Sequence, residues 1–239
     1  MRVMGIDGCR GGWVATVRPL AGGPAERIVS PALAPLLGLP DLAAIAIDMP
    51  IGLPERIGPE GRGPEKALRP WLGQRQSSVF SVPARSAVYA ADYQDANRCS
   101  LETSDPPRKV SKQCFFLFPK IRELDTLLRH EPDLAARVHE CHPEGAFMAM
   151  NGMKPLAEPK KTKGQVYAPG LAERIRLLTG VAGFDAAFLE NAPRGAGRDD
   201  VLDSAACAWS AARIARGEAL PFPQNYGLDP HGLRIVIRI

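Results

Sequence analysis

Short apolar runs near the start of the chain predict a strand-rich opening. Residues 2–7, 13–18 and 26–30 each have the pattern of a strand, and glycine-containing turns separate them. A helix is expected over 31–42. Residues 43–48 (AAIAID) are continuously apolar up to the final aspartate, which is typical of a strand buried on both faces. This order of three strands, a helix and a buried strand favours an α/β fold.

Helical spacing dominates the second half of the chain. The clearest helix is expected over 199–216, where apolar residues recur at helical intervals and Gly217 can end the helix. A shorter helix is expected over 171–179. Residues 137–141 predict another strand, and the alternating C-terminal string RIVIRI (234–239) predicts a strand at the sheet edge.

Glycine and proline number 23 each among the 239 residues, so short elements and many loops are expected. This composition is most pronounced between about 52 and 110, which we interpret as a loop-rich insertion. No composition shift marks a linker, and the length suits one domain over residues 1–239.

Composition and charge exclude several classes of protein. The five cysteines form no C-x-x-C pair, which argues against a disulfide framework or a thiolate zinc site. No apolar run approaches the roughly 18 residues that cross a bilayer, so we expect a cytoplasmic protein that does not bind a membrane. The net charge of +4 permits a polyanionic partner without requiring one.

Four aspartates occupy positions where α/β proteins form ligand sites. Asp7 ends the first predicted strand and Asp48 ends the buried strand, and strand ends of this kind line the usual ligand crevice. Asp200 and Asp203 are three residues apart, so they share one face of the last predicted helix. Clustered carboxylates repel one another, and a divalent cation offsets that repulsion. Their hard oxygen atoms favour Mg²⁺ or Mn²⁺, which can support phosphoryl displacement.

Each aspartate also has a purely structural interpretation. Asp7 and Gly8 form a common turn pair, and Asp48 can simply end a strand. Asp200 and Asp203 complement the dipole at a helix start. The joint arrangement of two strand ends and a helix pair is what favours the metal-site hypothesis.

Six strings that span nearly the whole chain together resemble one bacterial family. That family is the domain of unknown function 429 family, described as predicted ribonuclease H-like nucleases with a fold like that of Holliday-junction resolvases. The resemblance implies a mixed five-stranded central sheet, with a three-strand meander followed by parallel strands, flanked by helices. The strings are GIDGCRGGW (5–13), AIDMPIGLP (46–54), RQSSVFSVPAR (75–85), ECHPEGAF (140–147), KKT (160–162) and DDVLDSAACAW (199–209).

The resemblance also implies a function and a set of metal ligands. In that superfamily the first strand, the fourth strand and a late helix carry metal-binding acids, and Asp7 and Asp48 match the first two positions. Asp200 and Asp203 match the D-x-x-D pair on the final helix of Holliday-junction resolvases, whereas Asp48 replaces their usual glutamate. The implied activity is hydrolysis of a phosphodiester in DNA or RNA with Mg²⁺ or Mn²⁺, and a homodimer is compatible with it.

The string ECHPEGAF supplies two further candidate catalytic groups. Glu140 is interpreted as an additional metal ligand. His142 is interpreted as a proton shuttle, because histidine has an ordinary pKa near 6.5. The alternative is that His142 and Pro143 form a rigid exit from a strand.

Arginine, serine and lysine side chains in the loops are candidates for binding phosphate oxygens. Aromatic residues make up only 6% of the chain, so recognition through backbone charge and shape is expected rather than base stacking. A solvated charged loop is the alternative for the lysines. The candidates are Arg10, Arg75, Ser77, Ser78, Arg85 and Lys161.

Two alternative functions remain open on the sequence. The first is an ATP-binding protein of the actin and sugar-kinase type, in which GIDGCRGG holds phosphates, although such proteins usually need two domains. The second is a non-catalytic module that binds a nucleotide or a protein on the same fold.

Overall fold

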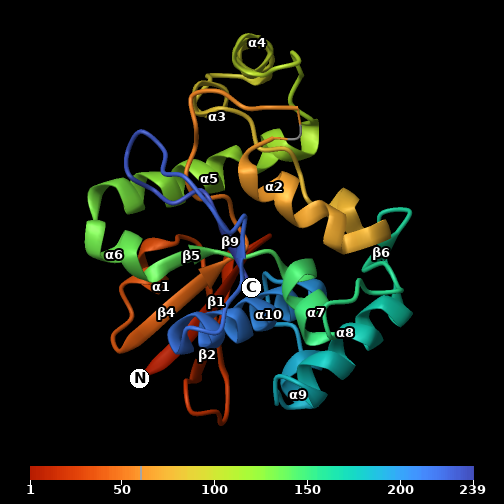
Figure 1. The fold of residues 1–239 in the computed structure, drawn as a ribbon. Coiled ribbons are helices and arrows are strands. Elements are labelled where there is room, and N and C mark those ends of the chain that lie inside the picture. The colour runs from red at the N-terminus through yellow and green to blue at the C-terminus, as the bar shows by residue number, and fades with distance from the viewer. Residues whose placement is uncertain (60) are drawn as a thin grey trace.

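The computed structural model describes residues 1–59 and 61–239. A seven-stranded sheet in this part of the chain has the order β3-β2-β1-β4-β5-β9-β8, and helices cover both of its faces (Figure 1). The three N-terminal strands form an antiparallel meander, β4, β5 and β9 run parallel to β1, and β8 is antiparallel to β9. The strands are β1 (Arg2–Cys9), β2 (Gly12–Pro19), β3 (Glu26–Ser30), β4 (Leu42–Ile47), β5 (Val138–Glu140), β8 (Pro221–Phe222) and β9 (Ile237–Arg238).

The central strands are apolar throughout because both of their faces are covered. Successive side chains of a strand point to opposite faces, so each face needs its own apolar set. Val3 and Ala46 belong to the core on one face, and Ile6 and Ile47 belong to the core on the other. The continuous apolar run before Asp48 therefore forms the buried strand that its pattern predicts.

Each core is closed by its own set of helices. One face is covered by α7 (Pro143–Met150), α8 (Ala168–Gly180), α9 (Ala186–Glu190) and α10 (Arg198–Arg216). The other is covered by α1 (Ala34–Leu37), α5 (Lys112–His130) and α6 (Pro132–Arg137). No helix in the described part of the chain is both long and apolar enough to span a membrane.

The region expected to be loop-rich contains four short or medium helices among its described residues, and α3 and α4 lie at one end of the molecule (Figure 1). A small separate hairpin follows much later in the chain. The four helices are α2 (Gly63–Leu68), the 3₁₀ helix η1 (Arg69–Ser78), α3 (Arg85–Val88) and α4 (Tyr93–Thr103). The hairpin consists of β6 (Lys161–Thr162) and β7 (Gln165–Val166).

Gly5 of β1 lets the long helix α10 lie directly on the sheet. A Cβ atom at Gly5 would lie 2.0 Å from the backbone nitrogen of Ala208 and 2.1 Å from the carbonyl oxygen of Ser204. Beside this contact the hydroxyls of Thr16 and Ser204 are 2.8 Å apart, which joins β2 to α10. The helix that carries Asp203 is thereby held against the strand that carries Asp7.

Two predictions about individual elements were wrong. The helix expected over 31–42 is confined to α1, because Pro40 cannot donate a backbone hydrogen bond and Asp41 has a φ of 60°. The C-terminal strand β9 is not at the edge, because β8 pairs with its outer side. The sheet therefore has seven strands rather than five.

Candidate functional site

Two of the predicted aspartates lie side by side at the C-terminal ends of two neighbouring central strands. Asp7 lies near the end of β1, and Asp48 directly follows β4, the parallel neighbour of β1. The backbone nitrogen of Asp48 donates to the carbonyl oxygen of Ile6 over 2.9 Å. Asp7 is buried, and its Oδ1 accepts a hydrogen bond of 2.7 Å from the backbone nitrogen of Gly8. Both carboxylates therefore lie where parallel strands commonly present ligand-binding groups.

Helix α10 adds a third carboxylate, and a lysine comes with it. Asp203 is buried, and its Oδ2 forms an ion pair with the ammonium of Lys160, which precedes β6. The side chain of Lys160 is 26% exposed. The other oxygen of Asp203, Oδ1, is buried and has no hydrogen-bond partner among the described residues. The cluster thus holds one ammonium group and an unsatisfied carboxylate oxygen.

The carboxylates of this cluster are poorly compensated. Burial, followed by the charges of Asp203 and Asp48, raises the pKa of Asp7 well above its usual range. Burial and the charge of Asp203 raise the pKa of Asp48 to about 8. Burial opposes the charged form of Lys160, but Asp203 and Asp7 raise the pKa of its ammonium overall. The site therefore favours additional positive charge.

Asp200, the fourth predicted ligand, has a different local role. Its Oδ2 accepts a hydrogen bond of 2.8 Å from the backbone nitrogen of Gly197, the residue that caps α10. Its neighbour Asp199 forms a 2.7 Å ion pair with Lys161. The charge of Asp200 still contributes to the raised pKa of Asp7, so the Asp200 carboxylate lies near the other three carboxylates, although its own hydrogen bond is to the start of α10.

The oxygen atoms of these carboxylates are of the type that binds a hard divalent cation. Asp7, Asp48 and Asp203 are carboxylates, and the unpartnered Oδ1 of Asp203 is a vacant oxygen donor. Within the described residues no three aspartate, glutamate, histidine or cysteine side chains converge closely enough to form a metal site as they stand. The ammonium of Lys160 provides the cationic charge in this arrangement.

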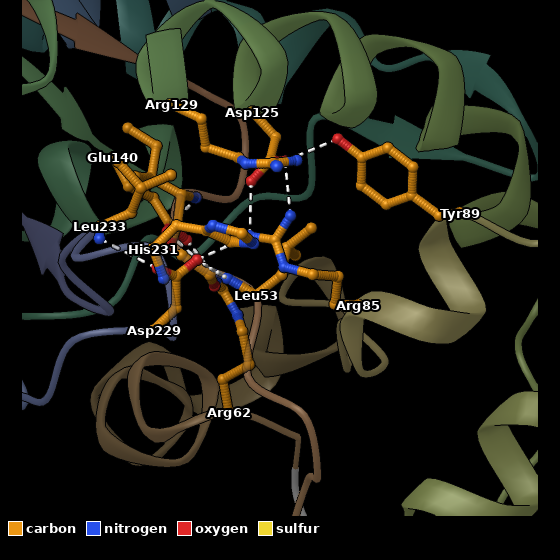
Figure 2. Close-up of polar contacts among 12 residues, drawn as sticks. Leu53, Arg62, Arg85, Tyr89, Asp125, Arg129, Glu140, Asp229, His231 and Leu233 are labelled. Atoms are coloured by element: carbon orange, nitrogen blue, oxygen red, sulfur yellow. Dashed lines mark hydrogen bonds and ion pairs between the residues drawn. The ribbon is translucent and has the colours of Figure 1, made fainter. Parts of the chain in front are cut away.

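Glu140 is already occupied by protein partners. Its Oε1 accepts a 2.7 Å hydrogen bond from Nη2 of Arg62, and both residues are labelled in Figure 2. Its Oε2 accepts a hydrogen bond of 2.7 Å from the backbone nitrogen of Ile51. Arg62 also contacts Glu65 Oε1 through Nε at 2.8 Å. Burial disfavours the charge of Arg62, but Glu140 and Glu65 raise its pKa overall. Glu140 thus anchors the segment after β4 to the sheet.

His142 lies at the start of α7, beside the carboxylate cluster. Its Nε2 is 3.4 Å from the carbonyl oxygen of Ser78, and its buried Nδ1 has no partner in the part of the chain that the structure describes. Burial lowers the pKa of His142 below its usual range. The imidazole is therefore neutral at pH 7 and can accept a proton.

Two adjoining cavities open beside these groups. The smaller has a volume of about 190 Å³ and reaches Asp7 and Glu140, while the larger has a volume of about 440 Å³ and reaches Asp203. Both cavities are lined by Asp48, Ser78, Phe80 and His142. The predicted phosphate-binding residues Arg75, Ser77, Ser78 and Lys161 line the larger cavity, together with Lys160 and Arg174.

Sequence comparison identifies the family of the chain. Residues 5–226 match the family described as "Protein of unknown function (DUF429)". The chain belongs to this family. Neither the curated proteins nor the solved structures yield a significant match. The strings on which the resemblance rests, from GIDGCRGGW to DDVLDSAACAW, lie within the matched part of this DUF429 protein.

Two predicted substrate-binding arginines of the DUF429 chain lie apart from the cavities. Arg85 forms ion pairs of 2.7 Å with both Asp125 and Asp229, and Figure 2 shows its guanidinium between them. Arg10 is exposed in the turn between β1 and β2. Neither arginine belongs to the described lining of the two cavities.

Three important residues of the DUF429 site were not among the predicted site residues. Lys160 was one member of a basic loop, and nothing in the spacing distinguished it from Lys161. Arg62 lies in a stretch rich in glycine and proline. Arg174, which pairs with the buried Glu144, did carry a signal, because it lies at helical spacing from the apolar residues of α8.

Proposed function

We propose that this DUF429 protein is a metal-dependent phosphodiesterase of the ribonuclease H-like type that hydrolyses nucleic acid. The observation that carries the proposal is that three carboxylates, from two adjacent strand ends and one helix, lie near enough for their charges to raise one another's pKa. Asp48 and Asp203 line the same cavity as Arg75 and Lys161, and Asp7 lines the cavity that adjoins it. Acidic groups beside basic ones suit the binding of a cation together with a phosphate.

The topology supports this proposal. A three-strand meander followed by parallel strands, with a late helix packed on β1, agrees with the ribonuclease H-like arrangement that the resemblance implies. Strands β9 and β8 extend the sheet beyond β5. The acids lie on the first strand, after the fourth strand and on the final helix, as the proposed fold requires.

Asp7, Asp48 and Asp203 would hold the cation, and Asp200 would support the start of α10. Bound Mg²⁺ or Mn²⁺ supplies Lewis-acid polarisation of a phosphate and promotes ionisation of water. Lys160 compensates the carboxylates from the side of the larger cavity. The acidic centre thereby adjoins Arg75, which would hold the phosphate.

The remaining groups would bind the substrate and move a proton. Arg75, Ser77 and Lys161 offer charge and hydrogen bonds to phosphate oxygens from the wall of the larger cavity. His142 would accept a proton from the attacking water at Nδ1, which is buried and lacks a partner among the described residues. Its lowered pKa keeps that nitrogen available at neutral pH.

One observation favours a second candidate function. The ammonium of Lys160 already pairs with Asp203, so a cationic group of the protein itself occupies part of the acidic centre. A non-catalytic nucleotide-binding module on the same fold would need no more than this arrangement. The two functions differ in whether a divalent cation supports turnover.

Hydrolysis assays distinguish these functions. We expect the wild-type protein, with Mn²⁺ or Mg²⁺, to cleave at least one of single-stranded DNA, single-stranded RNA, duplex, branched DNA or bis(4-nitrophenyl) phosphate. Asp7→Asn and Asp203→Asn should each lower the rate more than about 100-fold, because loss of outer-shell partners alone costs 10–100-fold. Asp133→Asn, at an exposed position of α6, is the matched control. Turnover that survives in both site variants, or that needs no metal, would refute the proposal.

A further inference from the structure

The smaller cavity is a mostly apolar chamber whose lining extends well beyond the carboxylates Asp7 and Asp48 that it reaches. Its volume of about 190 Å³ exceeds that of several water molecules, each of which occupies about 30 Å³ in the liquid. Residues Leu117 and Ile121 of α5 line it together with Phe80 and Val82 from the loop after η1. Such walls suit the faces of a flat ring system rather than bulk water.

The chamber also presents polar atoms that lack partners. Glu65 has a side chain only 2% exposed; its Oε1 is bonded to Arg62, but its Oε2 has no hydrogen-bond partner among the described residues. His142 Nδ1 also lacks a partner among the described residues, but the proposed function uses it as the proton acceptor, so Glu65 Oε2 is the acceptor left for a ligand. Both side chains line this cavity. An unsatisfied buried acceptor is costly, so the chamber suits a ring whose edge carries an N–H group.

The two cavities together match the two ends of a nucleotide. They share Asp48, Ser78, Phe80 and His142 in their linings, so one ligand can reach from the apolar chamber into the larger cavity. The larger cavity offers Arg75, whose buried Nε has no partner among the described residues and suits an anionic group, while its two lysines pair with Asp203 and Asp199. A nucleobase has apolar faces and a hydrogen-bonding edge, and it is linked through a sugar to a phosphate.

We propose that the smaller cavity binds the base of one unpaired nucleotide whose phosphate lies in the larger cavity. The assignment of the phosphate rests on the proposed function, and the base-binding chamber adjoins the same site through Asp7 and Asp48. The nucleotide is either free or unpaired within a strand, since a base enclosed by Phe80 and Leu117 has left its stack. Continuous base-paired duplex is therefore excluded from this chamber.

Calorimetry in EDTA tests the chamber separately from any metal-dependent step. The probes are AMP, GMP, CMP, UMP, ribose 5-phosphate, and a single strand long enough to form a stable duplex, tested with and without its complement. We expect at least one mononucleotide or the single strand to bind at least tenfold more tightly than ribose 5-phosphate and the duplex. Binding of the mononucleotide identifies free nucleotide as a ligand, and binding of the strand alone identifies an unpaired base within a chain.

A pair of variants on one helix locates the site. Leu117→Trp fills the chamber and should weaken binding at least tenfold, whereas Leu127→Trp, at a half-buried position of α5 away from the chamber, should not. Phe80→Ala removes a wall and provides a second test if Leu117→Trp does not fold, which circular dichroism will show.

Three results would overturn the base-binding inference: no binding by any nucleotide or strand, ribose 5-phosphate binding as tightly as the mononucleotides, or wild-type affinity in the chamber variants. If the protein shows metal-dependent cleavage together with any of these results, the proposed function is supported and the base-binding inference is wrong. If it shows base-dependent binding without cleavage, the base-binding inference is supported and the proposed phosphodiesterase activity is wrong.

Discussion

At the scale of single residues, the charge balance of the site depends on Lys160. Asp7, Asp48 and Asp203 are drawn together by the fold, and burial raises the pKa of each. Among the described residues the ammonium of Lys160 forms an ion pair with Asp203 Oδ2, and Asp203 Oδ1 has no hydrogen-bond partner. One ammonium does not keep three buried carboxyls ionised, and this is the physical reason to expect a divalent cation.

His139 provides a prediction for stability against pH. It lies on β5, where burial, followed by the charges of Arg234 and Arg238, lowers its pKa from 6.5 to about 3. Between these values the unfolded chain binds a proton that the folded protein does not. The contribution of neutral His139 is therefore fully present above pH 6.5 and is lost as the pH falls toward 3. The loss is at most about 1.4 kcal/mol per pH unit.

Urea unfolding of His139→Gln from pH 7 to pH 4 measures this contribution. We expect the variant to lose less stability on acidification than the wild type. His130→Gln, at an exposed position of α5, is the control and should follow the wild type. Equal pH slopes for His139→Gln and the wild type would show that burial of His139 does not affect acid stability.

At the scale of elements, the site depends on how closely α10 approaches β1. Gly5 permits that approach, because any side chain there would overlap the backbone of Ala208. Gly5→Ala should lower the free energy of unfolding by about 1–3 kcal/mol, as expected when an extra methyl group is forced into a packed contact. It should also move α10 away from β1 and so separate Asp203 from Asp7. Urea unfolding provides the measurement. Gly180→Ala, at the end of α8 with no atom within 4 Å of the added Cβ, is the control. Equal stabilities for the two variants would contradict the packing account.

Element predictions succeeded where an apolar pattern has a single physical meaning. The short, continuous apolar run that ends in Asp48 is typical of a strand covered on both faces, and it forms β4. Gly217 ends α10 with a φ of 74°, a conformation suited to glycine. The position of β9 was not predictable, because an alternating pattern does not identify which strand lies beside it.

Side-chain partners in the site were less predictable than the elements. Strand ends predicted that Asp7 and Asp48 would meet, because parallel neighbours share an edge. The partners of Glu140 and Arg85 lie far away in sequence, so local spacing could not reveal that each side chain was already committed. Lys160 was ambiguous for the same reason, since adjacent lysines differ only in the direction that the fold gives them.

At the scale of the whole molecule, a buried ion-pair network fastens the region after β4 to the sheet. Arg62 is paired with Glu65 and Glu140, and Arg85 is paired with Asp125 and Asp229 (Figure 2). These contacts join segments from the middle of the chain to α5, β5 and the C-terminal region. The same segments form walls of the smaller cavity, so the network maintains the shape of that chamber.

Removing Arg62 should release this connection. Arg62→Met leaves Glu65 and Glu140 buried without their cation, which should lower stability by about 3–5 kcal/mol in urea unfolding. Arg98→Met removes an arginine of α4 whose side chain is 60% exposed and should change stability little. A small effect of Arg62→Met, similar to that of Arg98→Met, would show that the network does not stabilise the fold.

The central claim is that the carboxylate cluster binds a divalent cation, and calorimetric titration of Mn²⁺ tests it most directly. The titration compares the wild type with the Asp7→Asn/Asp203→Asn double variant, each alone and with a mixed single-stranded oligonucleotide, because substrate phosphate can complete such a site. We predict that the wild type binds Mn²⁺ and that the double variant does not. Equal binding by both proteins, or no binding by the wild type even with the oligonucleotide present, would contradict the account.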